Sequence, residues 1–221
     1  MARIDGVAVP DSKIASEATE LVRDTASALL FNHSSRVYYF GALAGQQRGV
    51  QFDAELLYIS SMFHDLGLTD RHSSRSDRFE VDGANAARDF LRRHGIDQKD
   101  IDTAWAAIAL HTTPGIPQHM HPVIALLNAG VLMDVVGIGY EAFTEAQRNS
   151  VVAAYPRPPS FEEEIIEAFY QGMKHKPDTT YGTINADILS AKDPSFHRMD
   201  VCSRILHSRW RESRQPAGRL G

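Results

Sequence analysis

Apolar residues recur at three- and four-residue steps along the N-terminal part of the chain, which is the spacing of one face of an α-helix. The pattern predicts a first helix over residues 13–30 and a second that begins near His33 and ends in the glycine-containing turn at 45–49. A third helix is expected over residues 53–64, capped by its first aspartate and stopped by the next glycine. We therefore expect His64 and Asp65 at a helix end.

Helical patterns return over residues 82–94, 97–111 and 122–136. The last of these is so apolar that we expect it to be a buried helix. Residues 66–78 are polar and show no apolar periodicity, so they predict a loop, which either covers a site as a lid or is simply solvated.

Two pairs of residues in the second half of the chain match the capping box, in which a hydroxyl side chain and a Glu or Gln three positions later start a helix. They are Thr144 with Gln147 and Ser160 with Glu163. No convincing strand alternation is present. The sequence therefore predicts an all-α fold, a bundle of about seven or more helices.

Composition is typical of a globular chain, because 43% of the 221 residues are hydrophobic and 23% are charged. We expect a single domain over residues 1–221, with the basic end at 209–221 disordered. The net charge of -5, with acids and bases interspersed, does not favour nucleic acid, so the expected partner is a small-molecule substrate. A homo-oligomer stays open as an alternative to a monomer.

No apolar run approaches the roughly 20 residues that cross a bilayer, and the first residues lack the pattern of a signal peptide. We expect a cytoplasmic protein that does not enter the membrane. Cys202 is the only cysteine of the chain, which excludes an intramolecular disulfide and a thiolate metal cluster. Any metal must therefore use histidine and carboxylate ligands.

Asp65 and Asp134 each stand within strongly apolar sequence. Burying an ionised carboxylate is costly unless a cation or several donors compensate it, and one shared divalent metal would compensate both. The alternative for Asp134 is a buried ion pair with Arg36, which otherwise is expected to orient a ligand carboxylate.

The order of His33, then His64-Asp65, then Asp134 resembles the H…HD…D signature of the HD superfamily of metal-dependent hydrolases. Four stretches are similar to its cyanamide hydratase-like branch: NHSSRVYYFG at 32–41, HDLGL at 64–68, FEVDGA at 79–84 and LLNAGVLMDVVG at 126–137. The similarity covers roughly residues 25–140.

The resemblance implies one divalent metal held by His33, His64, Asp65 and Asp134. Zinc is the expected ion, with iron, manganese and nickel as alternatives. Cyanamide hydratases add water to a small nitrile and convert cyanamide to urea. The resemblance therefore implies hydration of a small nitrile by metal-activated water.

Two departures from relatives bear on this reaction. Phe79 stands where two-metal HD enzymes place a further histidine, which favours a single metal. Leu68 stands where many HD phosphohydrolases have Lys or Glu, which disfavours hydrolysis of a nucleotide or phosphomonoester. That activity is the alternative enzyme hypothesis, and a non-catalytic HD domain that senses a metabolite is the second alternative.

Three residues are expected to carry the chemistry. Asp65 would activate water and His111 would assist proton transfer, unless His111 only caps its helix end with a nitrogen satisfied by backbone. Glu80 would act as a general acid or base, or else would serve the helix dipole at a helix start.

Overall fold

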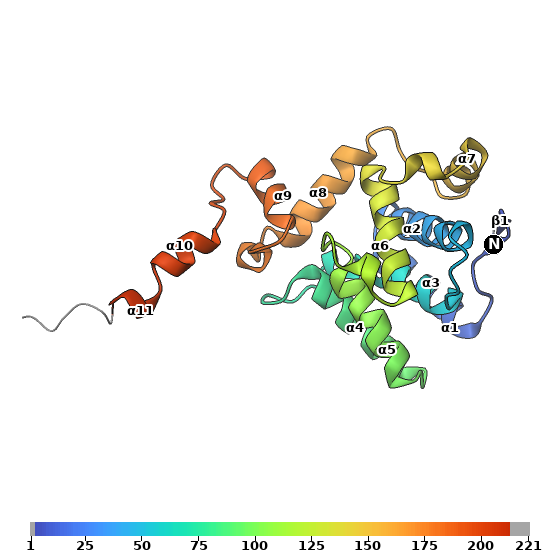
Figure 1. The fold of residues 1–221 in the computed structure, drawn as a ribbon, viewed down its shortest axis with the longest axis horizontal. Coiled ribbons are helices and arrows are strands. Elements are labelled where there is room, and N and C mark those ends of the chain that lie inside the picture. The colour runs from blue at the N-terminus through green and yellow to red at the C-terminus, as the bar shows by residue number, and fades with distance from the viewer. Residues whose placement is uncertain (1–2, 213–221) are drawn as a thin grey trace, which may run out of the picture.

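The computed structural model describes residues 3–212 and shows the all-α fold that the sequence predicts (Figure 1). The helices of the main body are α1 (Lys13–Thr25), α2 (Ala28–Gln47), α3 (Ala54–Phe63), α4 (Phe79–Arg93), α5 (Gln98–Leu110), α6 (Pro122–Val136) and α7 (Glu145–Ala154). They are followed by α8 (Phe161–Met173), α9 (Asn185–Lys192), α10 (Val201–Leu206) and α11 (Arg209–Glu212). Short 3₁₀ turns lie at η1 (Leu66–Leu68), η2 (Pro117–His119), η3 (Tyr140–Ala142) and η4 (Pro177–Thr180).

The centre of the bundle is the pair α2 and α6, with α3 against α2 and α5 against α6. Gly130 on α6 lies so close to α2 that a Cβ atom there would stand 2.2 Å from the carbonyl oxygen of Val37. Only glycine allows two helix backbones to approach this closely. The contact brings the C-terminal half of α6, which carries Asp134, against the N-terminal half of α2, which carries His33.

The prediction of one helix over residues 13–30 is wrong in its last turn, because this range is divided between α1 and α2. Ala26 and Ser27 are extended, and the Ser27 hydroxyl accepts a hydrogen bond from the Leu30 backbone N–H. A serine oxygen that satisfies a free N–H at a helix start favours a new helix over continuation of the old one. As a result α2 begins five residues before His33, and His33 lies inside the helix rather than at its start.

Two other boundaries differ from the prediction. The first three residues of the expected loop form η1, because Leu66 and Leu68 are buried. The following helix, α4, begins at Phe79 instead of 82, and its first turn buries both Phe79 and Glu80.

The two capping boxes have different outcomes. At the start of α7, Thr144 and Gln147 exchange both hydrogen bonds, so this capping box is confirmed. At α8 the helix start is confirmed at Ser160, but the hydroxyl makes no cap and instead donates to Glu164.

The chain ends carry less regular structure. Arg3–Ile4 and Val7–Ala8 form a two-stranded antiparallel hairpin, which the sequence did not predict. In Figure 1, α10 and α11 extend away from the other helices. Arg209–Glu212 form α11, whereas the rest of the segment expected to be disordered, 213–221, lies outside the described residues.

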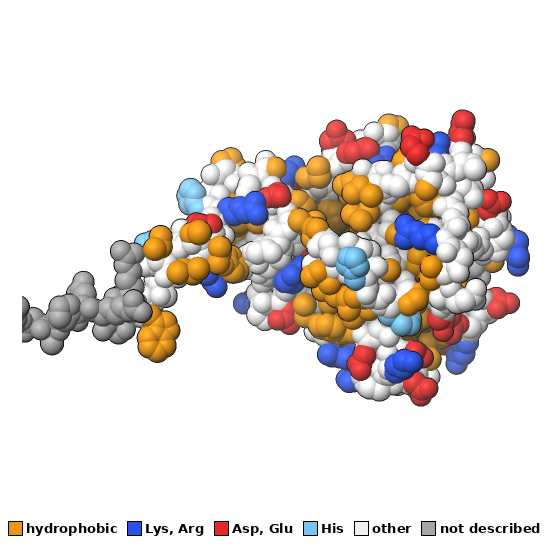
Figure 2. All heavy atoms as spheres, viewed as in Figure 1, with side chains coloured by type: hydrophobic (Ala, Val, Ile, Leu, Met, Phe, Trp, Pro, Cys, Tyr) orange, Lys and Arg blue, Asp and Glu red, His pale blue; other side chains and the backbone are white. Residues whose placement is uncertain are grey.

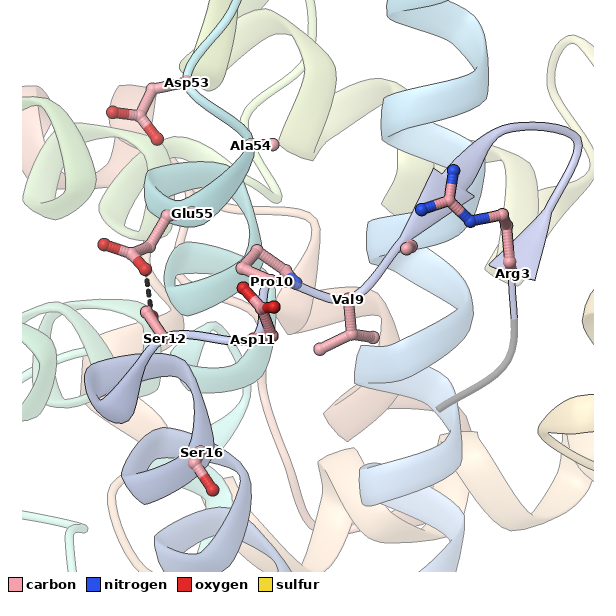
Figure 3. A pocket seen from close by; sticks show the side chains of 10 residues that line it. Arg3, Val9, Pro10, Asp11, Ser12, Ser16, Asp53, Ala54 and Glu55 are labelled. Atoms are coloured by element: carbon pink, nitrogen blue, oxygen red, sulfur yellow. Dashed lines mark hydrogen bonds between the residues drawn. The ribbon is translucent and has the colours of Figure 1, made fainter.

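A surface hollow of about 830 Å³ lies between the N-terminal segment and the start of α3 (Figure 3). Its side chains have local structural partners: Ser12 donates to Glu55, and Asp53 caps α3 by accepting from the Leu56 N–H. Within residues 3–212, no helix combines the length and apolar character needed to cross a bilayer.

Candidate metal centre

Three histidines and one aspartate from three helices meet in the interior of the bundle. His33 comes from α2, His64 and Asp65 end α3, and His111 ends α5; each is at most 2% exposed. The Nε2 atoms of His33 and His64 are 3.2 Å apart. Asp65 Oδ2 lies 3.2 Å from His64 Nε2 and 3.5 Å from His33 Nε2, and Asp65 Oδ1 lies 3.5 Å from His111 Nε2.

The hydrogen bonds on the far side of each ring determine which nitrogen faces this cluster as an acceptor. His64 Nδ1 is 2.7 Å from the Ser61 carbonyl oxygen, and His111 Nδ1 is 2.7 Å from the Ile108 carbonyl oxygen. A carbonyl only accepts, so each Nδ1 carries the proton and the Nε2 of the neutral ring presents a lone pair. His33 Nδ1 is held in the same way by the Asp134 carboxylate, 2.7 Å away.

Asp65 faces these lone pairs with a carboxylate that has no hydrogen-bond partner within the described chain, because the nearby imidazoles lack hydrogen-bond geometry to it. Burial would raise the pKa of Asp65, but His64 and His111 hold it well below its usual value. The carboxylate is therefore ionised. Acceptors pointing at one another at this spacing repel unless a cation lies among them.

The pKa values of the two ligand-type histidines differ in direction. Burial lowers the pKa of His33, although Asp134 opposes this effect. Burial would also lower the pKa of His64, but the adjacent Asp65 carboxylate outweighs it and the pKa is raised. The Asp65 carboxylate therefore favours positive charge at the His64 ring. His33, His64 and Asp65 offer ligand atoms that all lie within 4.8 Å of one another, and this buried group can hold a divalent metal.

Asp134 lies behind His33, outside the group of atoms that converge. Its oxygens accept from Arg36 Nε at 2.7 Å and Arg36 Nη2 at 2.8 Å, in addition to the contact with His33. Burial would raise the pKa of Asp134, but His33 and Arg36 lower it. The structure thus shows the ion pair that the sequence left open, while the prediction that Asp134 is a fourth ligand stays a prediction.

The family model described as HD domain matches residues 30–169, which is more than half of the chain. The chain belongs to the HD-domain family. No curated protein matches it. An HD domain with a buried His-His-Asp group indicates a metal-dependent hydrolase, and the match spans every residue of the cluster described above.

A cavity of about 950 Å³ opens directly onto the HD centre, with His33, His64, Asp65 and His111 in its wall. Most of the remaining wall is apolar, and its apolar members include Ala125, Ala129, Val131, Leu132, Val135, Phe143, Phe169, Ile184 and Ile188. Figure 2 shows hydrophobic side chains gathered around a hollow in the middle of the visible face, where α6 and α8 lie in Figure 1. Arg48 is the one arginine of the described residues that lines the cavity.

The loop at 66–78 is tied to the body of the HD domain. The Ser74 backbone N–H donates to Asp82, whose carboxylate also pairs with the buried Lys176 at 2.5 Å. The loop arginines Arg71, Arg75 and Arg78 are not part of the cavity wall among the described residues. The lid hypothesis has no support from this arrangement, and it stays a prediction.

Glu80 is buried next to the centre with its oxygens occupied. Arg78 Nη2 donates to it at 2.8 Å, Asn185 Nδ2 donates at 2.9 Å, and the Thr112 hydroxyl donates as well. Burial would raise the pKa of Glu80, but Arg78 and His111 lower it. An ionised carboxylate with this many donors is a poor proton donor, so the geometry favours a positioning role over general acid catalysis.

Sequence reasoning missed the polar part of the cavity wall. Asn128 and Asn185 both line it, yet only Asn128 lies within a motif, and neither was singled out. Asn185 follows the weakly patterned region after residue 174 and lies beyond the HD-domain match. No spacing rule along the chain connects it to His64, more than a hundred positions earlier.

Proposed function

We propose that this HD-domain protein is a metal-dependent hydrolase or hydratase that adds water to an uncharged substrate held in the apolar cavity. The observation that carries the proposal is the convergence of imidazole lone pairs on the unpartnered Asp65 carboxylate at the cavity wall. The donor set fits a divalent ion such as zinc, with iron, manganese or nickel as alternatives.

His33, His64 and Asp65 would hold the metal, which when bound supplies Lewis-acid activation of water. His111 would then accept a proton from the attacking water at Nε2. Its Nδ1–H bond to the Ile108 carbonyl fixes the ring and stabilises the imidazolium that forms. Asp65 Oδ1, 3.5 Å from His111 Nε2, favours the same proton transfer electrostatically.

We propose that Asp134 acts chiefly through His33. A carboxylate that accepts the proton of a ligand's second nitrogen orients the ring and raises its basicity. Arg36 would keep this carboxylate in place through its bidentate contact. Direct ligation by Asp134, as the resemblance implies, requires the carboxylate to exchange its His33 contact for the metal.

Two features bear on the substrate. The similarity to the cyanamide hydratase-like branch makes cyanamide the first compound to test, and the apolar wall agrees with an uncharged substrate. A cavity of about 950 Å³ also accommodates a nitrile or amide with a larger apolar group. A wall with Arg48 as its one arginine among the described residues does not favour a phosphomonoester, whose charge needs several donors.

The metal assignment is tested by measuring bound metal in His64→Ala and Asp65→Ala proteins after loading and dialysis. We expect near-stoichiometric metal in the wild type and loss in both variants. His94→Ala is the matched control, because His94 binds Glu17 and the Phe90 carbonyl at the far end of α4. Unchanged metal in both site variants would remove the basis of the proposal.

The reaction is tested with metal-loaded protein on cyanamide, on larger nitriles and on a panel of phosphomonoesters. Turnover of the first two groups alone supports hydration, whereas turnover of phosphomonoesters alone supports the phosphohydrolase alternative. Bound metal with no turnover of any compound would favour the metabolite-sensor alternative.

A further inference from the structure

Two asparagine side chains in the cavity wall share an arrangement that bears on what the cavity binds. Asn128 on α6 is 6% exposed and Asn185 at the start of α9 is 3% exposed. Asn128 Nδ2 donates to the His111 carbonyl oxygen at 2.8 Å, and Asn185 Nδ2 donates to Glu80 Oε1 at 2.9 Å.

These contacts determine which end of each side-chain amide faces its partner. A backbone carbonyl and a carboxylate only accept hydrogen bonds, so the NH₂ group of each asparagine must face them. The Oδ1 atom of each side chain therefore points the other way. Each amide is held by its donor end, and its acceptor end is left for another molecule.

Neither Oδ1 accepts a hydrogen bond from any residue that the structure describes, and neither is among the buried polar atoms sealed from solvent without a partner. Both residues line the cavity, where a ligand can reach them. Acceptors in a largely apolar wall gain most from a ligand that brings donors, because an unpaired polar group there is costly.

Both amides are linked to consecutive residues at the end of α5, His111 and Thr112. Asn128 holds the carbonyl of His111, and Asn185 is joined through Glu80 to Thr112, the next residue. Asn128 and Asn185 line the same cavity as His111 and Asp65, so one bound molecule can contact all four side chains.

We propose that Asn128 and Asn185 are specificity-determining residues that accept hydrogen bonds from an N–H-bearing group of the substrate. An NH₂ group carries two donors and matches two acceptors, whereas a hydroxyl carries one. The substrate class is then an uncharged primary amide, urea or amino-substituted nitrile, with an apolar group against the rest of the wall. This inference rests on the proposed function for the reaction that follows binding, but binding itself is measured without turnover.

The test uses matched pairs of probes that differ in their N–H groups: benzamide with N,N-dimethylbenzamide, and cyanamide with dimethylcyanamide. Affinity is measured by calorimetric titration of the full chain loaded with Zn²⁺. The methylated member of each pair has more apolar area, so a preference for the other member cannot come from the hydrophobic effect. We expect the N–H member to bind at least about tenfold tighter in the wild type.

Asn185→Leu keeps the size of the side chain, removes the acceptor and should abolish most of this preference while bound metal stays at the wild-type level. Asn149→Leu, on an exposed position of α7, is the control for the exchange itself. Equal binding of both members by the wild type, no binding of either pair, or full preference in Asn185→Leu would each overturn the inference. Loss of metal binding or of turnover is a separate result that bears on the proposed function.

Discussion

At the scale of single residues, the wholly buried Arg36 contacts three parts of the molecule. Its guanidinium binds both oxygens of Asp134, and its third nitrogen donates to the carbonyl of Pro156 at 2.9 Å in the linker before α8. The same group lies over the ring of Phe161, 4.9 Å from its centroid. A single side chain thus connects α2, α6 and the start of α8.

Replacing Arg36 with methionine should lower the free energy of unfolding by about 3–5 kcal/mol, because it leaves the Asp134 carboxylate buried without its cation. Denaturant titration of the metal-free protein measures this effect. The double variant Arg36→Met with Asp134→Leu should recover part of the loss, since it removes the stranded charge as well. No recovery in the double variant would contradict this explanation.

The three converging residues of the candidate centre were predictable, because His33 and His64-Asp65 stand with Asp134 in a recognisable order along the chain. Their partners were not predictable in the same way. Which nitrogen of His64 faces Asp65 depends on the Ser61 carbonyl, and that contact exists only once α3 has ended where it does. The same holds for Glu80, whose carboxylate contacts Arg78, Thr112 and Asn185 only in the folded protein.

At the scale of elements, the segment after His64-Asp65 is held by backbone contact. Gly67 in η1 lies against the first turns of α4, where a Cβ atom would stand 2.0 Å from the Phe79 carbonyl oxygen. Since η1 follows Asp65 directly, this contact limits where the carboxylate can lie.

Gly67→Ala should therefore destabilise the protein by about 3 kcal/mol, the upper range for overpacking a core, and should also weaken metal binding. Gly115→Ala is the comparison, because nothing lies within 4 Å of its Cβ position and only its left-handed backbone is strained. That variant should cost about 1 kcal/mol and leave metal affinity unchanged. Thermal unfolding and metal titration of both proteins measure the difference; equal effects would refute the steric argument.

The two capping sequences make a second comparison between elements. Thr144→Ala removes a working capping box and should destabilise the protein by about 1 kcal/mol. Ser160→Ala should lower the free energy of unfolding by only about 0.3 kcal/mol, because the Ser160 hydroxyl makes no cap. Chemical denaturation of the two variants in parallel checks the order, and a larger loss for Ser160→Ala would reverse our assignment.

Helix existence followed from periodicity, but helix boundaries depended on single side chains. The apolar spacing continues through Ala26 and Ser27, so periodicity alone did not reveal the break that the Ser27 hydroxyl creates. The early start of α4 was hidden for the same kind of reason, because Glu80 is charged in the sequence and becomes buried only among its partners.

At the scale of the whole molecule, α8 and α9 contribute a wall of the cavity, and the segment between them is fastened to the bundle by a buried ion pair. Lys176, next to η4, reaches Asp82 on α4, and its side chain is fully buried. A second hydrophobic cluster, with Leu68, Phe79, Phe161 and Ile165 among its members, joins the same wall to η1 and α4.

Lys176→Met should loosen this wall without affecting the metal ligands. We expect faster backbone hydrogen exchange in residues 161–192, together with an overall destabilisation of about 3–5 kcal/mol from the stranded Asp82 charge. Metal affinity under native conditions should stay at the wild-type level. Exchange measured by mass spectrometry tests the claim, and faster exchange confined to α2 and α3 would contradict it.

The cavity wall combines residues from inside the HD-domain match with residues of α9 and the position before it, which lie beyond the match. The groups proposed to activate water belong to the HD bundle, whereas Asn185, Ile184 and Ile188 belong to a segment that begins after the family's match has ended. Substitutions there can alter what enters the cavity while the ligand-bearing helices keep their sequence. A laboratory evolution experiment restricted to 177–192 would therefore change substrate preference and leave the metal requirement untouched.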